Sequence, residues 1–243
     1  MPVQQQEIAL VNQPDRARPR ESMREKIKAT ATGLFICHGY RGVSFGDIAS
    51  ELGITRANIH YHFGNKQKLL EEVLEDYVNG TLARMAGIWR DDTRTFSQKV
   101  EGIHAFNRER YTKFNRGPGP GGKHWSLITR MRNDSDVIGE KARSTLQRFA
   151  RVLSSDIEAG VRSAMQRSEI KSTAPVTEIV VQAVSIVNAA GTITQDAGNF
   201  DRLDILYPSF LRTVQAAYGT MAGNGNGRKK QTKASTVKAG SKR

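Results

Sequence analysis

The segment from Ser44 to Phe63, SFGDIASELGITRANIHYHF, constrains the fold more than any other part of the sequence. Ser44 is a good N-cap residue, and Asp47 stands three positions later, as in a capping box. Gly53 supplies the positive φ that ends a short helix at a tight turn, and Thr55 caps a second helix. Two short helices joined by such a turn are typical of a helix-turn-helix.

The rest of the sequence predicts an all-α fold. Between residues 24 and 39, apolar side chains recur at helical spacing and would close a small core with the helix-turn-helix. From about residue 21 to residue 220 nearly everything fits helix, and no run alternates apolar and polar residues as a strand would. We therefore expect an N-terminal three-helix helix-turn-helix domain followed by a longer C-terminal helical domain.

The second helix of the motif is expected to enter the major groove of DNA. Arg56 suits guanine and Asn58 suits adenine through paired hydrogen bonds, whereas side chains such as Tyr61 and Lys66 are placed for phosphate contacts. The alternative is a solvated helix face that touches no nucleic acid. The predicted DNA-binding residues are Ser44, Thr55, Arg56, Asn58, His60, Tyr61, His62 and Lys66.

The charge of the chain favours a polyanionic partner. The 243 residues carry a net charge of +13, which favours nucleic acid or an anionic membrane surface. Residues 221–243 hold seven basic residues and no acid, and their composition predicts a disordered tail that adds salt-sensitive DNA affinity or is inert. Residues 1–20 read as a flexible basic arm that follows the minor groove or is simply solvated.

Compartment signals favour a soluble protein. Cys37 is the single cysteine, so an internal disulfide is impossible, which fits a reducing cytoplasm. The first residues lack the apolar core of a signal peptide. The longest apolar stretch, Ile179 to Val187, falls short of the roughly 20 residues that span a bilayer. We expect a cytoplasmic protein without a membrane partner.

Two apolar segments near the C-terminus predict a dimer interface. Between residues 176 and 193 apolar side chains occupy almost the whole helix circumference, so the helix must be buried all round. A second subunit is the simplest cover, and a central position in a monomeric bundle is the alternative. Pro208 should kink the last helix or lie in its first turn. The predicted interface residues are Val180, Val184, Val187, Leu203, Tyr207, Phe210 and Val214.

Residues 24–70 resemble the N-terminal domain of the tetracycline-repressor (TetR) family. The stretch HGYRGVSFGDIASELGITRANIHYHFGNKQKLLEEVL follows the family pattern in order. That pattern is a Gly-aromatic-x-Gly link, a Thr/Ser helix start, an Ile-Ala pair, a Gly-Val/Ile turn, an aromatic-rich recognition helix and a lysine opening a long fourth helix. His60 stands where the family usually has a tyrosine that contacts phosphate, so the imidazole would replace that contact or read a base edge.

The resemblance implies a helical effector and dimerisation domain, in which the last two helices form a four-helix bundle across a homodimer. It implies a palindromic operator in double-stranded DNA and release by an unidentified small-molecule effector, with no other cofactor. We expect an arm at 1–20, the DNA-binding domain at 21–66, a ligand-binding and dimerisation domain at 67–220 and a tail at 221–243. The candidate pocket residues, which are otherwise ordinary core, are Phe106, Tyr111, Phe114, Trp125, Met131 and Asn188.

These features favour a sequence-specific transcriptional regulator, a repressor released by a ligand. The alternatives are an activator and a ligand-independent DNA-organising protein driven by the basic tail. The stretch GPGPGGK at 117–123 is close to a phosphate-binding loop, but its prolines lack N–H groups and His124 stands where Ser or Thr is needed. His60 and His62 diverge on a helix and cannot share a metal. We expect no enzyme, no catalytic residue and no metal site.

Overall fold

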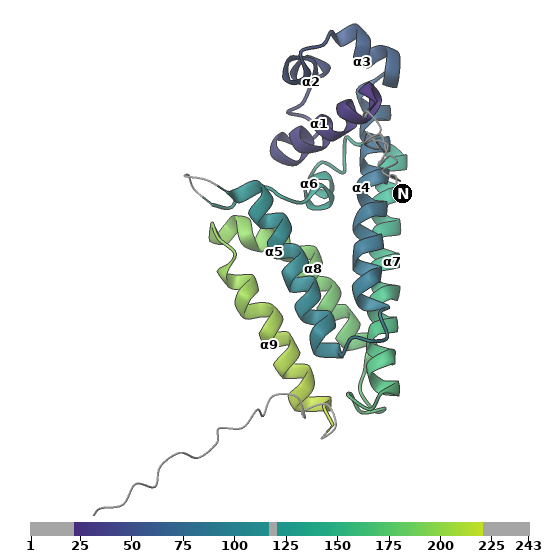
Figure 1. Ribbon diagram of the computed structural model, residues 1–243, viewed down its shortest axis with the longest axis vertical. Helices are drawn as coiled ribbons and strands as arrows, with labels where there is room; N and C mark the ends of the chain where they lie inside the picture. Colours follow the sequence, from purple (N-terminus) through teal and green to yellow (C-terminus); the bar gives the residue numbers. More distant parts are fainter. Residues whose placement is uncertain (1–21, 117–120, 221–243) are drawn as a thin grey trace, which may run out of the picture.

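A computed structural model describes residues 22–116 and 121–220, and within these ranges the fold is all-α, as predicted (Figure 1). Apart from one isolated backbone bridge, from Ile170 to Gly219, the described residues form no β-structure. The predicted arm at 1–20 and tail at 221–243 lie outside the described residues. The helices are α1 (Met23–His38), α2 (Phe45–Leu52), α3 (Arg56–Phe63), α4 (Lys66–Trp89), α5 (Phe96–Asn115), α6 (Leu127–Asn133), α7 (Gly139–Gln166), α8 (Val176–Ala197) and α9 (Asp201–Tyr218).

Helices α1, α2 and α3 form the predicted three-helix unit at one end of the molecule (Figure 1). Ile27 and Phe35 of α1, Ile48 of α2, and Ile59 and Phe63 of α3 are all buried, with exposed fractions of 0–3%. These are the positions at which the sequence repeats apolar residues with helical spacing. Burial of this stripe is what stabilises the short helices, because isolated helices of this length are marginal in water.

The long helix α4 joins the three-helix unit to the rest of the protein. It packs on both α1 and α7, and Figure 1 shows α4 and α7 running side by side along the molecule. Helix α8 packs on α7, and α9 packs on α8 and α5. The short α6 contacts α1 on one side and α8 on the other. Any displacement of α6 therefore bears on the three-helix unit.

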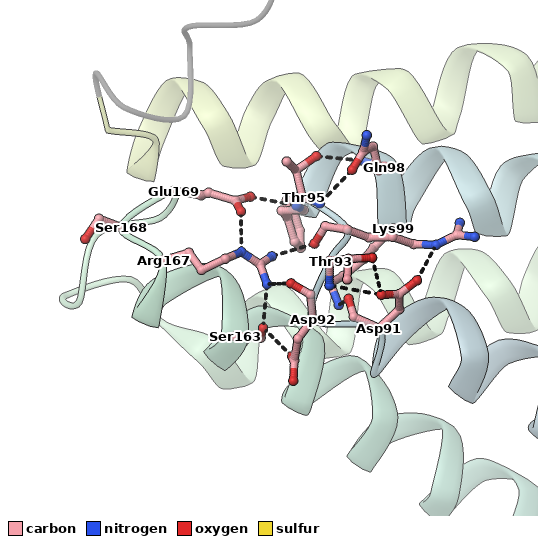
Figure 2. Close-up of polar contacts among 12 residues, drawn as sticks. Asp91, Asp92, Thr93, Thr95, Gln98, Lys99, Ser163, Arg167, Ser168 and Glu169 are labelled. Atoms are coloured by element: carbon pink, nitrogen blue, oxygen red, sulfur yellow. Dashed lines mark hydrogen bonds and ion pairs between the residues drawn. The ribbon is translucent and has the colours of Figure 1, made fainter.

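A polar cluster closes the end of the body farthest from the three-helix unit (Figure 2). Lys99 is fully buried, and its ammonium group donates hydrogen bonds of 2.6 Å to the carbonyl oxygens of Trp89 and Asp91. Arg167 donates to the carbonyl oxygen of Asp92 at 2.8 Å. Burial lowers the pKa of Lys99. The cluster fixes the connection between α4 and α5, because these carbonyl groups have no helical partner.

The apolar stripe of α9 faces the inside of the protomer, which corrects the predicted interface. Leu203, Tyr207, Phe210 and Val214 have exposed fractions of 0–7%, because α5 and α8 cover them. These side chains have almost no free area for a second subunit. Pro208 lies within α9 and does not begin it, so the expectation that the helix starts there is wrong.

Helix α8 is less covered than its composition requires. Val180 is buried, Val184 and Val187 are half-buried, and Val181 is 58% exposed. Helix α8 is long enough and apolar enough to cross a membrane. The sequence prediction missed this because it considered only the stretch from Ile179 to Val187. In the most apolar 18-residue window of α8, 28% is buried inside the protein. The protomer by itself therefore does not supply the all-round burial that the sequence predicts for this helix.

Candidate nucleic-acid interface

The turn between α2 and α3 is built by local hydrogen bonds, as predicted. The Ser44 hydroxyl accepts a bond from the Asp47 amide at 3.3 Å, and the Asp47 carboxylate accepts one from the Ser44 amide at 2.7 Å. Gly53 ends α2 in the left-handed region, with φ of 64°. The Thr55 hydroxyl accepts from the Asn58 amide at 3.2 Å and so caps α3. These contacts hold α3 at a defined angle to α2.

The outer face of α3 carries two side chains suited to DNA. Tyr61 is 86% exposed. Arg56 is also exposed, and it makes no ion pair with a described residue. Its guanidinium lies across the start of α2, where a Cβ at Gly46 would come within 2.7 Å of Nη2. The glycine therefore leaves the room that Arg56 occupies. A cation and an aromatic hydroxyl on one exposed helix can contact base edges and phosphates.

Asn58 departs from the prediction. Its side chain is half-buried, and its Oδ1 atom is buried without a hydrogen-bond partner among the described residues. Paired recognition of adenine needs both the oxygen and the nitrogen of the amide. As placed, Asn58 does not present its oxygen at the surface, which differs from the paired hydrogen bonds with adenine that the sequence predicts.

The two histidines of α3 are partly occupied by local contacts. His60 is exposed, but its Nδ1 lies 2.9 Å from the carbonyl oxygen of Gly64 and its ring packs edge-on to Phe45 at 4.8 Å. Only Nε2 of His60 therefore remains for DNA. His62 is half-buried, and its ring packs edge-on to Tyr61 at 5.3 Å. Both rings stiffen the exposed face of α3.

Lys66 also differs from its predicted role. Its ammonium group donates bonds of 2.9 Å to the carbonyl oxygens of Tyr40 and Val43, and it lies 4.3 Å from the centre of the Tyr40 ring. Burial lowers its pKa. Lys66 therefore holds the link between α1 and α2, which corrects the expected phosphate contact. Lys68, which the sequence analysis missed, is exposed in the first turn of α4. Nothing in the KQK pattern distinguishes the two lysines.

Helix α6 connects the three-helix unit to the body through polar contacts. The Asp134 carboxylate accepts a bond from the Tyr40 amide at 2.8 Å. Arg41 forms an ion pair with Asp136. The guanidinium of Arg130 lies against Gly39, where an added Cβ would be 2.7 Å from Nε. The end of α6 thus touches the link that precedes α2.

The six predicted pocket residues do not surround one cavity. Trp125 and Asn188 line an internal cavity of about 20 Å³. Phe106 and Phe114 line a separate open groove of about 610 Å³ between α1, α4 and α5. Tyr111 packs on the ring of Phe200 at 5.2 Å, and Met131 is fully buried. Neither of these two lines the cavity or the groove, so their placement in a common pocket is wrong.

The described residues contain no group of three or more His, Cys, Asp or Glu side chains arranged to hold a metal ion.

Two further residues that were not predicted from the sequence, Arg110 and Arg132, line the cavity of about 20 Å³. No sequence signal could have singled them out, because an arginine on a mixed helix is ordinarily expected at the surface.

Comparison with known proteins supports the interpretation of the N-terminal helices. Residues 27–73 match the family described as "Bacterial regulatory proteins, tetR family". The transcriptional regulator LmrA of Bacillus subtilis is 32% identical over 96 residues, which cover 38% of this chain and 47% of LmrA. The transcriptional repressor KstR2 of Mycolicibacterium smegmatis is 30% identical over 91 residues, covering 37% and 43%. The chain thus spans about half the length of these curated relatives.

Solved structures extend the likeness to the whole fold. A TetR transcriptional regulator from Legionella pneumophila matches with a TM-score of 0.67 and 19% identity, over 81% of this chain and 100% of that one. A cysteine mutant of the TetR-family regulator CifR, solved with 26-bp operator DNA, matches with a TM-score of 0.62 and 18% identity, over 81% and 99%. At these identities the likeness shows the fold. Residues 27–73 therefore match the TetR family of bacterial regulatory proteins, and the described helices share the fold of solved TetR regulators.

Proposed function

We propose that this protein is a sequence-specific DNA-binding transcriptional regulator, a repressor that leaves its operator when a small molecule binds. The observation that carries the proposal is α3, which a capped turn holds at the surface with Arg56 and Tyr61 exposed. A helix presented in this way enters the major groove in known helix-turn-helix proteins. The names of the relatives support repression, since KstR2 is a repressor and IcaR a negative regulator. Because the proposed target is DNA, we also propose a cytoplasmic location.

The active form that we propose is a homodimer on a palindromic operator. Val181 of α8 and Ile205 of α9 are 58% and 65% exposed, although both are large apolar side chains. Exposed apolar area on two neighbouring helices is typical of a subunit interface. We assign DNA binding to residues 21–66, and ligand binding and dimerisation to residues 67–220.

We propose that a bound ligand changes DNA binding by displacing α6. Ile128, Thr129 and Arg132 of this helix line the internal cavity, and Asp134 at its end binds the Tyr40 amide. A ligand shifts a conformational equilibrium only if it binds one state better than the other. A molecule that enlarges the cavity would displace α6, and with it the link that positions α2 and α3.

Selection of bound sequences from random double-stranded DNA tests this function with the full chain. We expect enrichment of an inverted repeat. Arg56→Ala should relax the preference at one base pair in each half-site, whereas Tyr61→Ala should weaken binding to all sequences alike. Arg151→Ala, at an exposed position on α7, is the matched control and should change neither. If the selection enriched no DNA sequence, the proposal would be overturned. If Arg56→Ala selected the same DNA sequence with the same preference at every base pair, the role of Arg56 would be overturned.

The basic tail keeps a DNA-organising role open as a second candidate, since residues 221–243 hold seven basic residues and no acid. Deletion of this segment separates the two functions. A regulator keeps its preference for the inverted repeat after deletion, whereas an organiser loses most of its affinity for every sequence. A promoter reporter then distinguishes repression from activation.

A further inference from the structure

Arg110 of α5 has no carboxylate partner among the described residues. Its guanidinium lies 4.7 Å from the ring centre of Tyr77, 5.2 Å from that of Phe106 and 5.9 Å from that of Trp125. Its one hydrogen bond to a described residue goes to the Thr81 hydroxyl at 3.2 Å. Burial lowers its pKa to about 10, so the group is still charged at neutral pH. Most of its N–H donors therefore have no acceptor among the described residues and are free to bind water or a ligand.

Arg132 of α6 lines the same internal cavity and also lacks a carboxylate partner among the described residues. It donates a hydrogen bond to Asn188 at 3.0 Å and lies 5.8 Å from the ring centre of Phe149. Burial lowers its pKa as well. No aspartate or glutamate lines the cavity, so two positive charges face one small, partly open cavity.

An anion would stabilise this arrangement. Two like charges at one cavity repel each other, and an anion bound between them would offset that repulsion. Two arginines at other helix contacts do have carboxylate partners. Arg90 lies 2.5 Å from the carboxylate of Asp156, and Arg148 lies 2.8 Å from that of Glu75. The two arginines at the cavity have no such partner in the described part of the chain, so they are available to an added anion.

The open groove beside the cavity has the size and lining for the rest of a ligand. Arg110 belongs to both the groove and the cavity, and thus separates them. The volume of about 610 Å³ lies within the range of small-molecule sites. Tyr77, Phe106 and Phe114 supply flat apolar surface. The acids of the groove, Asp76 and Glu109, are already paired with Lys28 and Arg84, so the groove is positive overall.

We propose that the effector is an organic acid with a planar apolar body. Its carboxylate binds between Arg110 and Arg132, and its body lies in the groove along Tyr77 and Phe106. The cavity of about 20 Å³ holds roughly one water molecule, so the carboxylate must separate α5 from α6 as it enters. This inference rests on the proposed function, because it names the class of ligand that would move α6.

Calorimetric titration of the full chain tests the proposal with defined probes. The acids are benzoate and naphthalene-2-carboxylate, and each is compared with its primary amide, which has nearly the same shape and no charge. We expect the acids to bind and the amides to bind at least tenfold more weakly. Arg110→Gln and Arg132→Gln should each weaken acid binding by about 10- to 100-fold. Arg151→Gln, at an exposed site on α7, should leave it unchanged.

The outcomes separate this inference from the proposed function. Equal binding of acid and amide, unchanged acid binding by both arginine variants, or no binding of either acid at millimolar concentration would overturn it. Inorganic phosphate binding as tightly as the aromatic acids would also overturn it, because the groove would then contribute nothing. Circular dichroism and operator binding without ligand should be the same for the variants and the wild type. If the wild type enriches no DNA sequence yet binds the acids, the proposed function fails while the site stands.

Discussion

Asp134 and Tyr40, which are 94 positions apart in the sequence, are joined by a hydrogen bond of 2.8 Å from the Tyr40 amide to the Asp134 carboxylate. The carbonyl oxygen of Tyr40 accepts a second bond from Lys66 at 2.9 Å. The link between α1 and α2 is therefore held on one side by the end of α6 and on the other by the start of α4. This is the point at which the body of the protein contacts the segment that positions α2 and α3.

Asp134→Ala is expected to destabilise the protein by about 1–3 kcal/mol, because the half-buried amide of Tyr40 loses its acceptor. Asp136→Ala is the matched control, since it removes only the exposed ion pair with Arg41, worth about 0–1 kcal/mol. Urea unfolding of the two variants measures the difference. Equal losses of unfolding free energy would show that the hydrogen bond between Tyr40 and Asp134 stabilises the protein no more than the exposed ion pair does.

Lys66 and Lys68 are expected to separate structure from DNA binding. Lys66→Met leaves two carbonyl oxygens unpaired, so we expect a loss of about 1–3 kcal/mol in unfolding free energy. Lys68→Met should change stability by no more than about 0.5 kcal/mol, and it should reduce the salt dependence of operator affinity by about one unit of slope. Fluorescence anisotropy at several salt concentrations measures this slope. If Lys66→Met reduced the salt dependence and Lys68→Met did not, Lys66 would be the phosphate contact.

The dimer interface is expected to depend on the exposed apolar residues of α8 and α9 and not on the inward stripe. Ile205→Glu and Val181→Glu should weaken the dimer at least about tenfold, with the helical content unchanged. Leu203→Glu should instead disrupt folding, because that side chain is fully buried. Sedimentation at a series of concentrations measures the association. Arg212→Glu, exposed on α9, is a charge control, and dimers unaffected by both apolar replacements would contradict this interface.

Acid should weaken the start of α2. Hydrogen bonds from the Ser44 hydroxyl, and then from its backbone, lower the pKa of Asp47. The contribution of Asp47 to stability is therefore present above the unfolded pKa of about 3.9 and is lost as the pH falls through the lower folded value. We expect the stability advantage of the wild type over Asp47→Asn to shrink below about pH 4. Unfolding curves from neutral to acidic pH measure it, and a difference that stays constant with pH would contradict this role.

Local chemistry made much of the fold predictable. The bonds of the Ser44–Asp47 capping box, the Gly53 turn and the Thr55 cap all join residues within a few positions of one another. Their energies depend little on the rest of the protein, so the helix-turn-helix could be predicted from the amino acids in order. The all-α class followed in the same way, from the spacing of apolar residues.

Packing between distant segments decided the rest. A periodic stripe shows that Leu203 and Phe210 share a buried face, but it does not show whether the same chain or a second subunit covers that face, and here α5 and α8 cover it. Lys66 and Lys68 are equivalent in sequence, yet only Lys66 reaches the carbonyl oxygen of Tyr40. Arg110 faces a cavity because helices from four other parts of the chain meet there. The sequence by itself determined where α2 and α3 begin and where α2 ends, since those signals are local. The tertiary structure decided which charged side chains find a partner, since that depends on what each helix packs against.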